Sequence, residues 1–199
     1  MFYEPALRNH GLRHDPLKAI VAPRPIGWIS SLSADGVANL APYSMFNMMS
    51  ETHPIIVGFS STGRKDSLTN IEATGEFVCN LAVYDLREEM NQSSARLPPE
   101  ADEFLHSRLT PAPSQKVKPP RVAESPAALE CVYLRTIPMV GRDGAAPAYF
   151  LVLGEVVGVH VDEAALTNGR FDITKVKTIA RLGYRDYAAV TETFEMTRP

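Results

Sequence analysis

Hydrophobic and polar positions alternate with a period of two over several short stretches, the pattern of an extended chain. Residues 26–31 (IGWISS) follow this pattern and predict a strand. Asp35 and Gly36 then supply a tight turn, and residues 37–41 form the second limb of a hairpin. Pro42 has no backbone N–H to give to a ladder and is expected to stop that limb. The Tyr, Ser, Phe and Asn residues that follow are therefore expected at the rim of a sheet.

The rest of the chain predicts more strands and two short helices. Further strands are expected at residues 55–59, 76–83, 127–137 and 149–161, and shorter elements at 171–179 and 188–194. Residues 142–144 (Arg-Asp-Gly) suit the connection of a hairpin between the two longest strands. After a polar loop at residues 60–63, one helix is expected from Asp66 as N-cap to Gly75 as C-cap. A capping box at residues 85–88 opens the other helix, which runs to about Gln92.

This order of elements predicts a mainly β fold, a β-barrel with a few short helices, rather than alternating βαβ units. We expect a single domain over residues 1–199. Residues 1–23 lack a clear period and are interpreted as an N-terminal arm lying on the domain. Residues 93–122 hold many of the prolines and are expected to form a long excursion over the surface, with one or two turns of helix at 102–109.

Composition and charge argue against several classes of function. The 199 residues are 45% hydrophobic, which suits a compact domain with its own core. The net charge is −3 and the basic residues are scattered, so nucleic-acid binding is not expected. No apolar run is long enough to span a membrane or to act as a secretion signal, and the cytoplasm is the expected location. Cys79 and Cys131 lie in apolar runs, and we expect both to be buried.

Several familiar catalytic motifs are missing. Gly58 and Gly63 have the spacing of a P-loop, but Arg64 and Lys65 follow where that motif needs Lys and then Ser or Thr. There is no G-x-G-x-x-G after a strand and no G-x-S-x-G elbow. His10 and His14 are four residues apart, but no third metal ligand accompanies them and they are interpreted as surface residues. The sequence therefore assigns no catalytic acid or base and no metal site.

A candidate anion site precedes the first helix. The first N–H groups of a helix have no intrahelical partner, and the helix dipole places partial positive charge there. Hydroxyls and charges are available nearby from Ser60, Ser61, Arg64, Lys65 and Ser67. On these residues alone, an ordinary solvated loop before a surface helix is the favoured interpretation.

The order of several short motifs resembles the flavin reductase-like family of FMN-binding split-barrel proteins. The motifs are RPIGWISS and ANLAPYSMFN in the hairpin region, RKDSLTNI, GEFVCNL, DEF, ESPAALEC, LGEVVGVHV and ARLGYRDY. The resemblance extends from about Ile20 to Tyr187, and it rests on the order of the motifs more than on any one of them.

The resemblance implies an FMN site and suggests its residues. The FMN phosphate would lie at the matching Lys65-Asp66-Ser67 segment, and Arg181 would approach the flavin, although Tyr184 stands where the family usually has a glycine. The backbone around Ala41–Ser44 and the Asn47 amide suit the polar edge of a flavin ring. Core packing remains the alternative for Tyr43, Phe46 and Trp28. The complete set of expected cofactor-binding residues is Trp28, Ala41, Pro42, Tyr43, Ser44, Phe46, Asn47, Ser60, Ser61, Arg64, Lys65, Asp66, Ser67 and Arg181.

The function implied by the resemblance is an oxidoreductase that passes electrons from NADH or NADPH through FMN to a flavin or another small acceptor. The alternative is a non-catalytic, FMN-binding electron-transfer protein similar to flavoredoxin. A hydrolase on the same barrel is the weaker third hypothesis. Family members are typically homodimers with FMN near the subunit interface, and a homodimer is accordingly expected.

Overall fold

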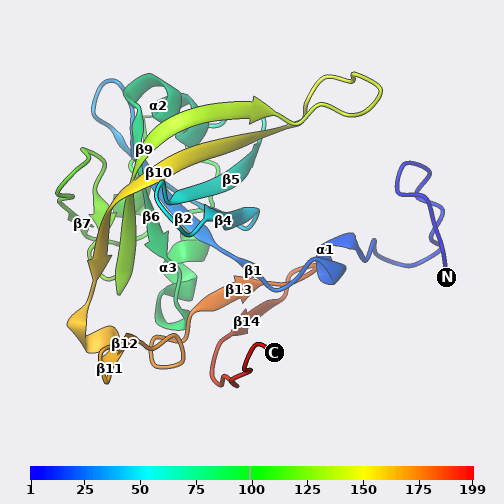
Figure 1. Ribbon diagram of the computed structural model, residues 1–199. Coiled ribbons are helices and arrows are strands. Elements are labelled where there is room, and N and C mark those ends of the chain that lie inside the picture. Colours follow the sequence, from blue (N-terminus) through cyan, green and yellow to red (C-terminus); the bar gives the residue numbers. More distant parts are fainter. Residues whose placement is uncertain (99) are drawn as a thin grey trace.

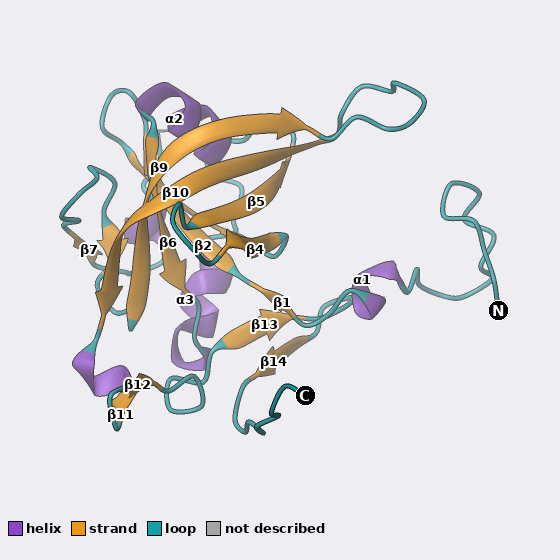
Figure 2. Ribbon diagram, in the orientation of Figure 1, coloured by secondary structure: helices purple, strands orange, loops and turns teal. Residues whose placement is uncertain are grey.

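Strands form most of the regular structure of this chain, as Figure 2 shows. The computed structural model describes residues 1–98 and 100–199. Pro99, which belongs to the predicted excursion, lies outside the described residues. The mainly β fold predicted from the sequence is confirmed.

The body of the molecule is one antiparallel sheet of seven strands in the order β3-β2-β6-β9-β10-β5-β4 (Figure 1). Its strands are β2 (Gly27–Leu32), β3 (Ala38–Tyr43), β4 (Phe46–Ser50), β5 (Ile56–Thr62), β6 (Glu76–Leu81), β9 (Ala127–Pro138) and β10 (Tyr149–Val161). The predicted hairpins of β2 with β3 and of β9 with β10 are both present.

The sheet curls so that its two edge strands come together. β3 and β4 are consecutive in the chain but lie at opposite edges of the sheet, and only Ser44 and Met45 connect them. The backbone N–H of Ser60 in β5 donates to the carbonyl of Met45 at 2.8 Å. A Cβ on Gly27 of β2 would lie 2.6 Å from the ring of Phe46, so this glycine allows the close approach of β4. The result is a barrel whose edges meet at the Ser44–Met45 link.

Both faces of β2 are buried, against two different hydrophobic clusters. Ile29 faces the barrel interior together with Phe59 and Phe77, and helix α2 (Asp66–Thr74) adds Leu68 and Ile71 to this cluster. The other face packs against a second cluster, which includes Trp28, Leu40, Met90, Phe104 and Val122. Cys79 and Cys131 are buried free thiols, as predicted.

Strand limits differ from the prediction where the edges of the sheet are formed. β3 continues through Pro42 to Tyr43, because a proline without an N–H is tolerated on an edge strand. β5 continues to Thr62, so Ser60 and Ser61 lie in a strand and not in the predicted loop. β4 was not predicted, because its FNMMS sequence has no β-branched residue and its side chains are mostly exposed.

The helices begin somewhat differently from the prediction. Lys65 is the N-cap of α2, so Asp66 is the first helical residue rather than the cap, and Gly75 ends the helix with a φ of 78° as expected. Among the described residues, 85–88 form no capping box, contrary to the prediction. A 3₁₀ turn, η1 (Tyr84–Leu86), occupies that position instead, and α3 (Arg87–Gln92) starts from Leu86 without a side-chain cap.

The proline-rich excursion packs deeply and is not confined to the surface. The carboxylate of Asp102 accepts a hydrogen bond from the N–H of Phe104 at 2.8 Å and starts α4 (Glu103–His106). Phe104, Leu109 and Val122 are buried in the second cluster. The excursion also contains the short antiparallel pair β7 (Pro111–Ala112) and β8 (Arg121–Val122). Prolines prevent long regular elements here, but the apolar side chains between them still reach the core.

A small second sheet joins the two ends of the chain. It contains β1 (Arg24–Pro25), β13 (Ile179–Arg181) and β14 (Tyr187–Ala189). The remaining short elements are α1 (Leu17–Ile20), η2 (Glu163–Ala165), β11 (Leu166–Thr167) and β12 (Arg170–Phe171). Figure 1 shows that the segment before α1 extends away from the barrel rather than lying on it, and most of its residues are exposed. None of the helices in the described part of the chain is long and apolar enough to cross a membrane.

Candidate functional site

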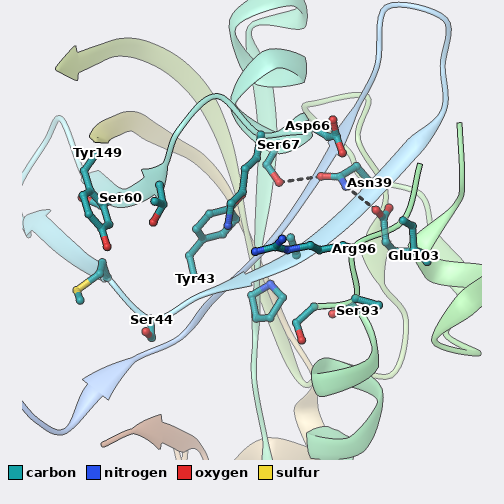
Figure 3. Close-up of a pocket in the computed structure, with 18 of the residues that line it drawn as sticks. Asn39, Tyr43, Ser44, Ser60, Asp66, Ser67, Ser93, Arg96, Glu103 and Tyr149 are labelled. Carbon is teal, nitrogen blue, oxygen red and sulfur yellow. Dashed lines mark hydrogen bonds between the residues drawn. The ribbon is translucent and has the colours of Figure 1, made fainter. Parts of the chain in front are cut away.

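A cavity of about 490 Å³ lies beside the edge strand β3, next to the start of α2. The segment after α3, residues 93–97, lines its other side. Figure 3 shows the side chain of Arg96 extending from that segment into the cavity, toward Tyr43. Strand β3, helix α2, the residues after α3 and helix α4 therefore converge on one space although they lie far apart in the sequence.

One wall of the cavity is a chain of buried, hydrogen-bonded side chains, which we call the bonded wall (Asn39, Ser67 and Glu103). The amide nitrogen of Asn39 donates to the Glu103 carboxylate at 2.9 Å. The Ser67 hydroxyl donates to the amide oxygen of Asn39 at 2.7 Å, and both bonds are drawn in Figure 3. The backbone N–H of Leu40 also donates to Glu103, at 3.3 Å. These bonds connect β3, α2 and α4.

Glu103 is an unusual wall residue because a carboxylate is costly to bury. Glu103 is only 6% exposed. Burial raises the pKa of Glu103 above its usual value, while its hydrogen bonds from Leu40 and Asn39 partly oppose that rise. The negative charge of Asp66 nearby raises the pKa further.

Tyr43 lines the same cavity, but its hydroxyl is buried away from solvent. The residue is 7% exposed, and among the residues that the structure describes its hydroxyl has no hydrogen-bond partner. Burial is the main cause of its raised pKa, and the nearby hydroxyls of Ser67 and Ser61 oppose the rise, although neither bonds to Tyr43 with good geometry. A buried hydroxyl without a partner lowers the free energy of unfolding, because it has lost its bonds to water without replacing them.

The charges that line the cavity favour an anion at the α2 end. Three basic side chains, Lys18, Lys65 and Arg96, line the cavity with two carboxylates, Asp66 and Glu103. The first N–H groups of α2 add partial positive charge, which contributes about 0.3–1 kcal/mol to an anion. The basic side chains attract an anion and the two carboxylates repel it, so its position in the cavity depends on the balance of the two.

A second cavity, of about 540 Å³, lies beside the first. The two share Ser44, Met45 and Ser60, so the link between β3 and β4 separates them. Apolar side chains from β4 and β10, such as Phe46 and Leu151, line the second cavity together with residues 20–25. A long ligand can therefore have a polar end near α2 and an apolar end near β4.

Ten of the fourteen residues expected from the sequence line these two cavities. Those in the first cavity are Ala41, Pro42, Tyr43, Ser44, Ser60, Lys65, Asp66 and Ser67. Phe46 and Asn47 line the second, which Ser44 and Ser60 also border.

The other four expected residues lie outside both cavities. Trp28 is completely buried in the second hydrophobic cluster, where its indole N–H donates to the Ser93 hydroxyl at 2.9 Å. Ser61 points into the interior and donates to the carbonyl of Gly63 at 3.0 Å. Arg64 turns away to an ion pair with Glu72. Trp28, Ser61 and Arg64 therefore each bond to another group of the protein, outside the two cavities.

Arg181, the fourth, bonds to its own neighbourhood in the small sheet. Its guanidinium donates to the Tyr187 hydroxyl and to the carbonyl of Tyr184, the latter at 2.7 Å. Tyr184 has a φ of 56°, in the left-handed region that favours glycine. The backbone therefore takes a path that a glycine would adopt without strain, although a tyrosine occupies the position.

Sequence reasoning missed several residues of the first cavity. The main ones are Asn39, Arg96, Glu103 and Tyr149. Glu103 lies in the DEF motif, which was noted without a role, and Asn39 lies within the ANLAPYSMFN motif. Arg96 carries no comparable signal, because only the folded excursion brings the residues after α3 to β3.

Comparisons with known proteins show the family and the fold of this chain. A family model described as flavin reductase like domain matches residues 21–184. An uncharacterised protein from Halalkalibacterium halodurans is 37% identical over 183 residues, covering 90% of this chain and 87% of the relative. The structure is similar to that of nitrilotriacetate monooxygenase component B from Bacillus cereus, with 33% identity, a TM-score of 0.88 and 98% of each chain covered.

The fold has a further match in a Shewanella frigidimarina protein described as a flavin reductase with a split barrel domain. That match has a TM-score of 0.82 and 23% identity, and it covers 99% of this chain and 94% of the other. The barrel described above is therefore a split barrel, as expected. Because the family model covers most of the sequence, from β1 to β13 and beyond, the chain belongs to the flavin reductase-like family.

Proposed function

We propose that this protein is an FMN-binding oxidoreductase that passes electrons from NADH or NADPH, through bound FMN, to a flavin or another acceptor. One observation carries the proposal: a cavity with a helix N-terminus and three basic side chains adjoins a second, more apolar cavity across a two-residue link. FMN has a phosphate at one end and a flat ring at the other, and when bound it supplies the electron-transfer chemistry that amino-acid side chains lack.

The α2 end of the first cavity fits the phosphate. Lys65 at the N-cap and Ser67 in the first turn line the cavity next to the free N–H groups of the helix. Arg96 and Lys18 add charge from other elements. Charge-assisted hydrogen bonds are the strong ones in proteins, so these residues would supply most of the affinity for a dianionic group.

The β3–β4 link fits the ring. Its two residues, Ser44 and Met45, border both cavities, so their backbone groups would be available to a polar ring edge. Phe46 and Leu151 offer apolar surface on the far side of the link. The volumes, about 490 and 540 Å³, are each within the usual range for small-molecule sites of roughly 300–1,000 Å³.

The acceptor and the oligomeric state are part of the same proposal. The similar Bacillus cereus protein is one component of a monooxygenase, which supports a flavin used by a second polypeptide as the acceptor. Met45, Met48 and Met49 are exposed on and beside β4, and Met45 and Met49 line the second cavity. Exposed apolar residues of this kind favour a homodimer that covers the ring end of the site. We expect this dimer in the cytoplasm.

Two measurements on the purified protein test the proposal. The first is the visible spectrum after reconstitution with FMN, in which stoichiometric flavin bands are expected. The second is steady-state oxidation of NADH and NADPH with FMN present, compared with FMN in buffer alone. Tight FMN binding without oxidation above the buffer rate would favour the electron-transfer alternative, and the absence of FMN binding would contradict both functions.

A further inference from the structure

The bonded wall fixes the direction of every hydrogen bond in it. An ionised carboxylate only accepts hydrogen bonds, so Glu103 must receive the N–H of Asn39. The amide oxygen of Asn39 then faces Ser67, and an amide oxygen only accepts. The Ser67 hydroxyl therefore donates its single proton to Asn39, whose amide oxygen also accepts a longer bond from Ser31 at 3.5 Å. While Glu103 is ionised, Ser67 offers the cavity lone pairs and no proton.

Such a wall is poorly suited to a phosphate, which is itself an acceptor. Protonation of Glu103 on the oxygen near Asn39 reverses the chain of bonds. The carboxylic acid donates to the amide oxygen of a flipped Asn39, and the amide nitrogen donates to the Ser67 oxygen. The Ser67 hydroxyl then keeps its proton and points it into the cavity. The second carboxyl oxygen still accepts from Leu40, and the bond between Ser31 and Asn39 reverses with the amide, so no bond of the wall is lost.

We propose that Glu103, acting through Asn39, sets whether Ser67 accepts or donates a hydrogen bond in the cavity, so that binding of a phosphate group is coupled to uptake of one proton by Glu103. This inference rests on the proposed function, because it takes the FMN phosphate as the ligand near Ser67. Glu103 is then a positioning residue, since its own contacts are with Asn39 and the backbone of Leu40.

The surroundings of Glu103 make such a proton uptake feasible. Burial already raises its pKa in the free protein, and Asp66 adds to the rise. A phosphate brought close to Glu103 would raise the pKa further by like-charge repulsion. The other charged or titratable side chains around the same cavity are Lys18 from α1, Tyr43 from β3, Lys65 and Asp66 from the start of α2, Arg96 from the segment after α3, and Tyr149 from β10.

The sign of the pH dependence follows. The protonated form of Glu103 binds phosphate better, so affinity for FMN should be highest at low pH and fall as pH rises through the pKa of Glu103. Linkage to one proton limits the fall to about tenfold per pH unit. The phosphate of FMN itself ionises with a pKa of about 6, which contributes equally in all variants.

The test is the dissociation constant of FMN, measured by quenching of flavin fluorescence across the pH range in which the protein stays folded. In Glu103→Gln the amide donates to Asn39 and accepts from Leu40, as protonated Glu103 would. We expect this variant to lose the Glu103-dependent fall and to bind FMN more tightly than the wild type at high pH. Glu124→Gln is the matched control, because Glu124 is exposed, lies two residues after the excursion and accepts from Thr110 outside the cavity.

A second measurement needs no variant. Calorimetry of the wild type at neutral pH, in buffers of different ionisation enthalpy, counts protons taken up on binding. Net uptake is expected with FMN and none with riboflavin, which lacks the phosphate. Identical pH profiles of wild type and Glu103→Gln, or no proton uptake with FMN, would overturn the relay while leaving the proposed function intact. Failure of the wild type to bind FMN at any pH would instead overturn the proposed function.

Discussion

The two sides of the first cavity are built in opposite ways. The bonded wall consists of buried side chains that satisfy one another across three elements. The facing side, which we call the exposed wall (Ser94, Ala95 and Arg96), follows the end of α3 and is solvent-exposed. Between them stands Tyr43, buried but without a hydrogen-bond partner in the described part of the chain.

This difference separates two tasks in ligand binding. A buried and mutually bonded wall holds its atoms in fixed positions, so it decides which groups and which protonation states are accepted. An exposed wall with a long arginine supplies a positive charge, but solvent weakens the attraction of that charge for a ligand. The arginine can adapt to the ligand, and fixing its side chain costs entropy. Changes to the bonded wall should therefore have larger effects than changes to the exposed wall.

The largest effect is expected from removing the anchor of the bonded wall. Phe104 is completely buried and adjoins Glu103 in α4. Phe104→Ala should lower the free energy of unfolding by about 3–5 kcal/mol, the usual cost of emptying a buried aromatic site. Denaturant unfolding measures this. Leu105→Ala, at the next and exposed position of α4, is the control and should have little effect. Equal losses in the two variants would show that the excursion is not anchored through Phe104.

The next largest effect concerns affinity. Lys65→Ala combined with Ser67→Ala should weaken FMN binding by roughly 2–4 kcal/mol, because charge-assisted hydrogen bonds contribute about 1.5–3 kcal/mol each and are rarely additive. Arg64→Ala serves as control, since Arg64 is paired with Glu72 outside the cavity. Fluorescence titration with FMN and with riboflavin measures the effect. Unchanged affinity in the double variant would place the phosphate elsewhere.

A smaller effect is expected on the exposed wall. Arg96→Ala should weaken FMN binding by about 1.5 kcal/mol, the lower end of the range for hydrogen bonds to charged groups, because Arg96 is exposed. Higher salt should reduce the difference from wild type. Arg87→Ala in α3 removes the same charge outside the cavity and should leave the affinity unchanged. A loss as large as that of the Lys65 and Ser67 double variant would remove the distinction between the walls.

Much of the fold was predictable because local patterns agreed with the global structure. The alternation in residues 26–31, the long apolar runs of β9 and β10 and the glycine that ends α2 each depend on near neighbours. β4 was missed because its methionines give no periodic signal and its position depends on closure of the sheet. The depth of the excursion was missed because prolines hide how its few apolar residues reach the core.

The residues of the site also differ in whether local sequence predicts them. Lys65, Ser67 and the residues of the β3–β4 link could be selected from local chemistry and from the family resemblance. Asn39, Glu103 and Arg96 could not, because each matters only through a partner or a space contributed by a distant segment. A single sequence identifies a helix N-terminus, but it does not show which carboxylate returns to face it.

The smallest effect on binding is expected from Trp28, and it tests where the bonded and exposed walls are joined. Trp28 lies behind β3 and donates to Ser93, the buried residue from which the exposed wall departs. Trp28→Phe keeps an aromatic ring in the core but leaves the Ser93 hydroxyl without its donor. The free energy of unfolding should fall by about 1–3 kcal/mol, whereas affinity for FMN should change by less than about twofold. Denaturant unfolding and flavin titration on the same preparation separate the two effects.

If the indole instead stacked on the flavin, affinity would fall sharply and the visible bands of the bound flavin would shift. An unchanged spectrum with reduced stability means that Trp28 positions the exposed wall through Ser93 and does not touch the ligand.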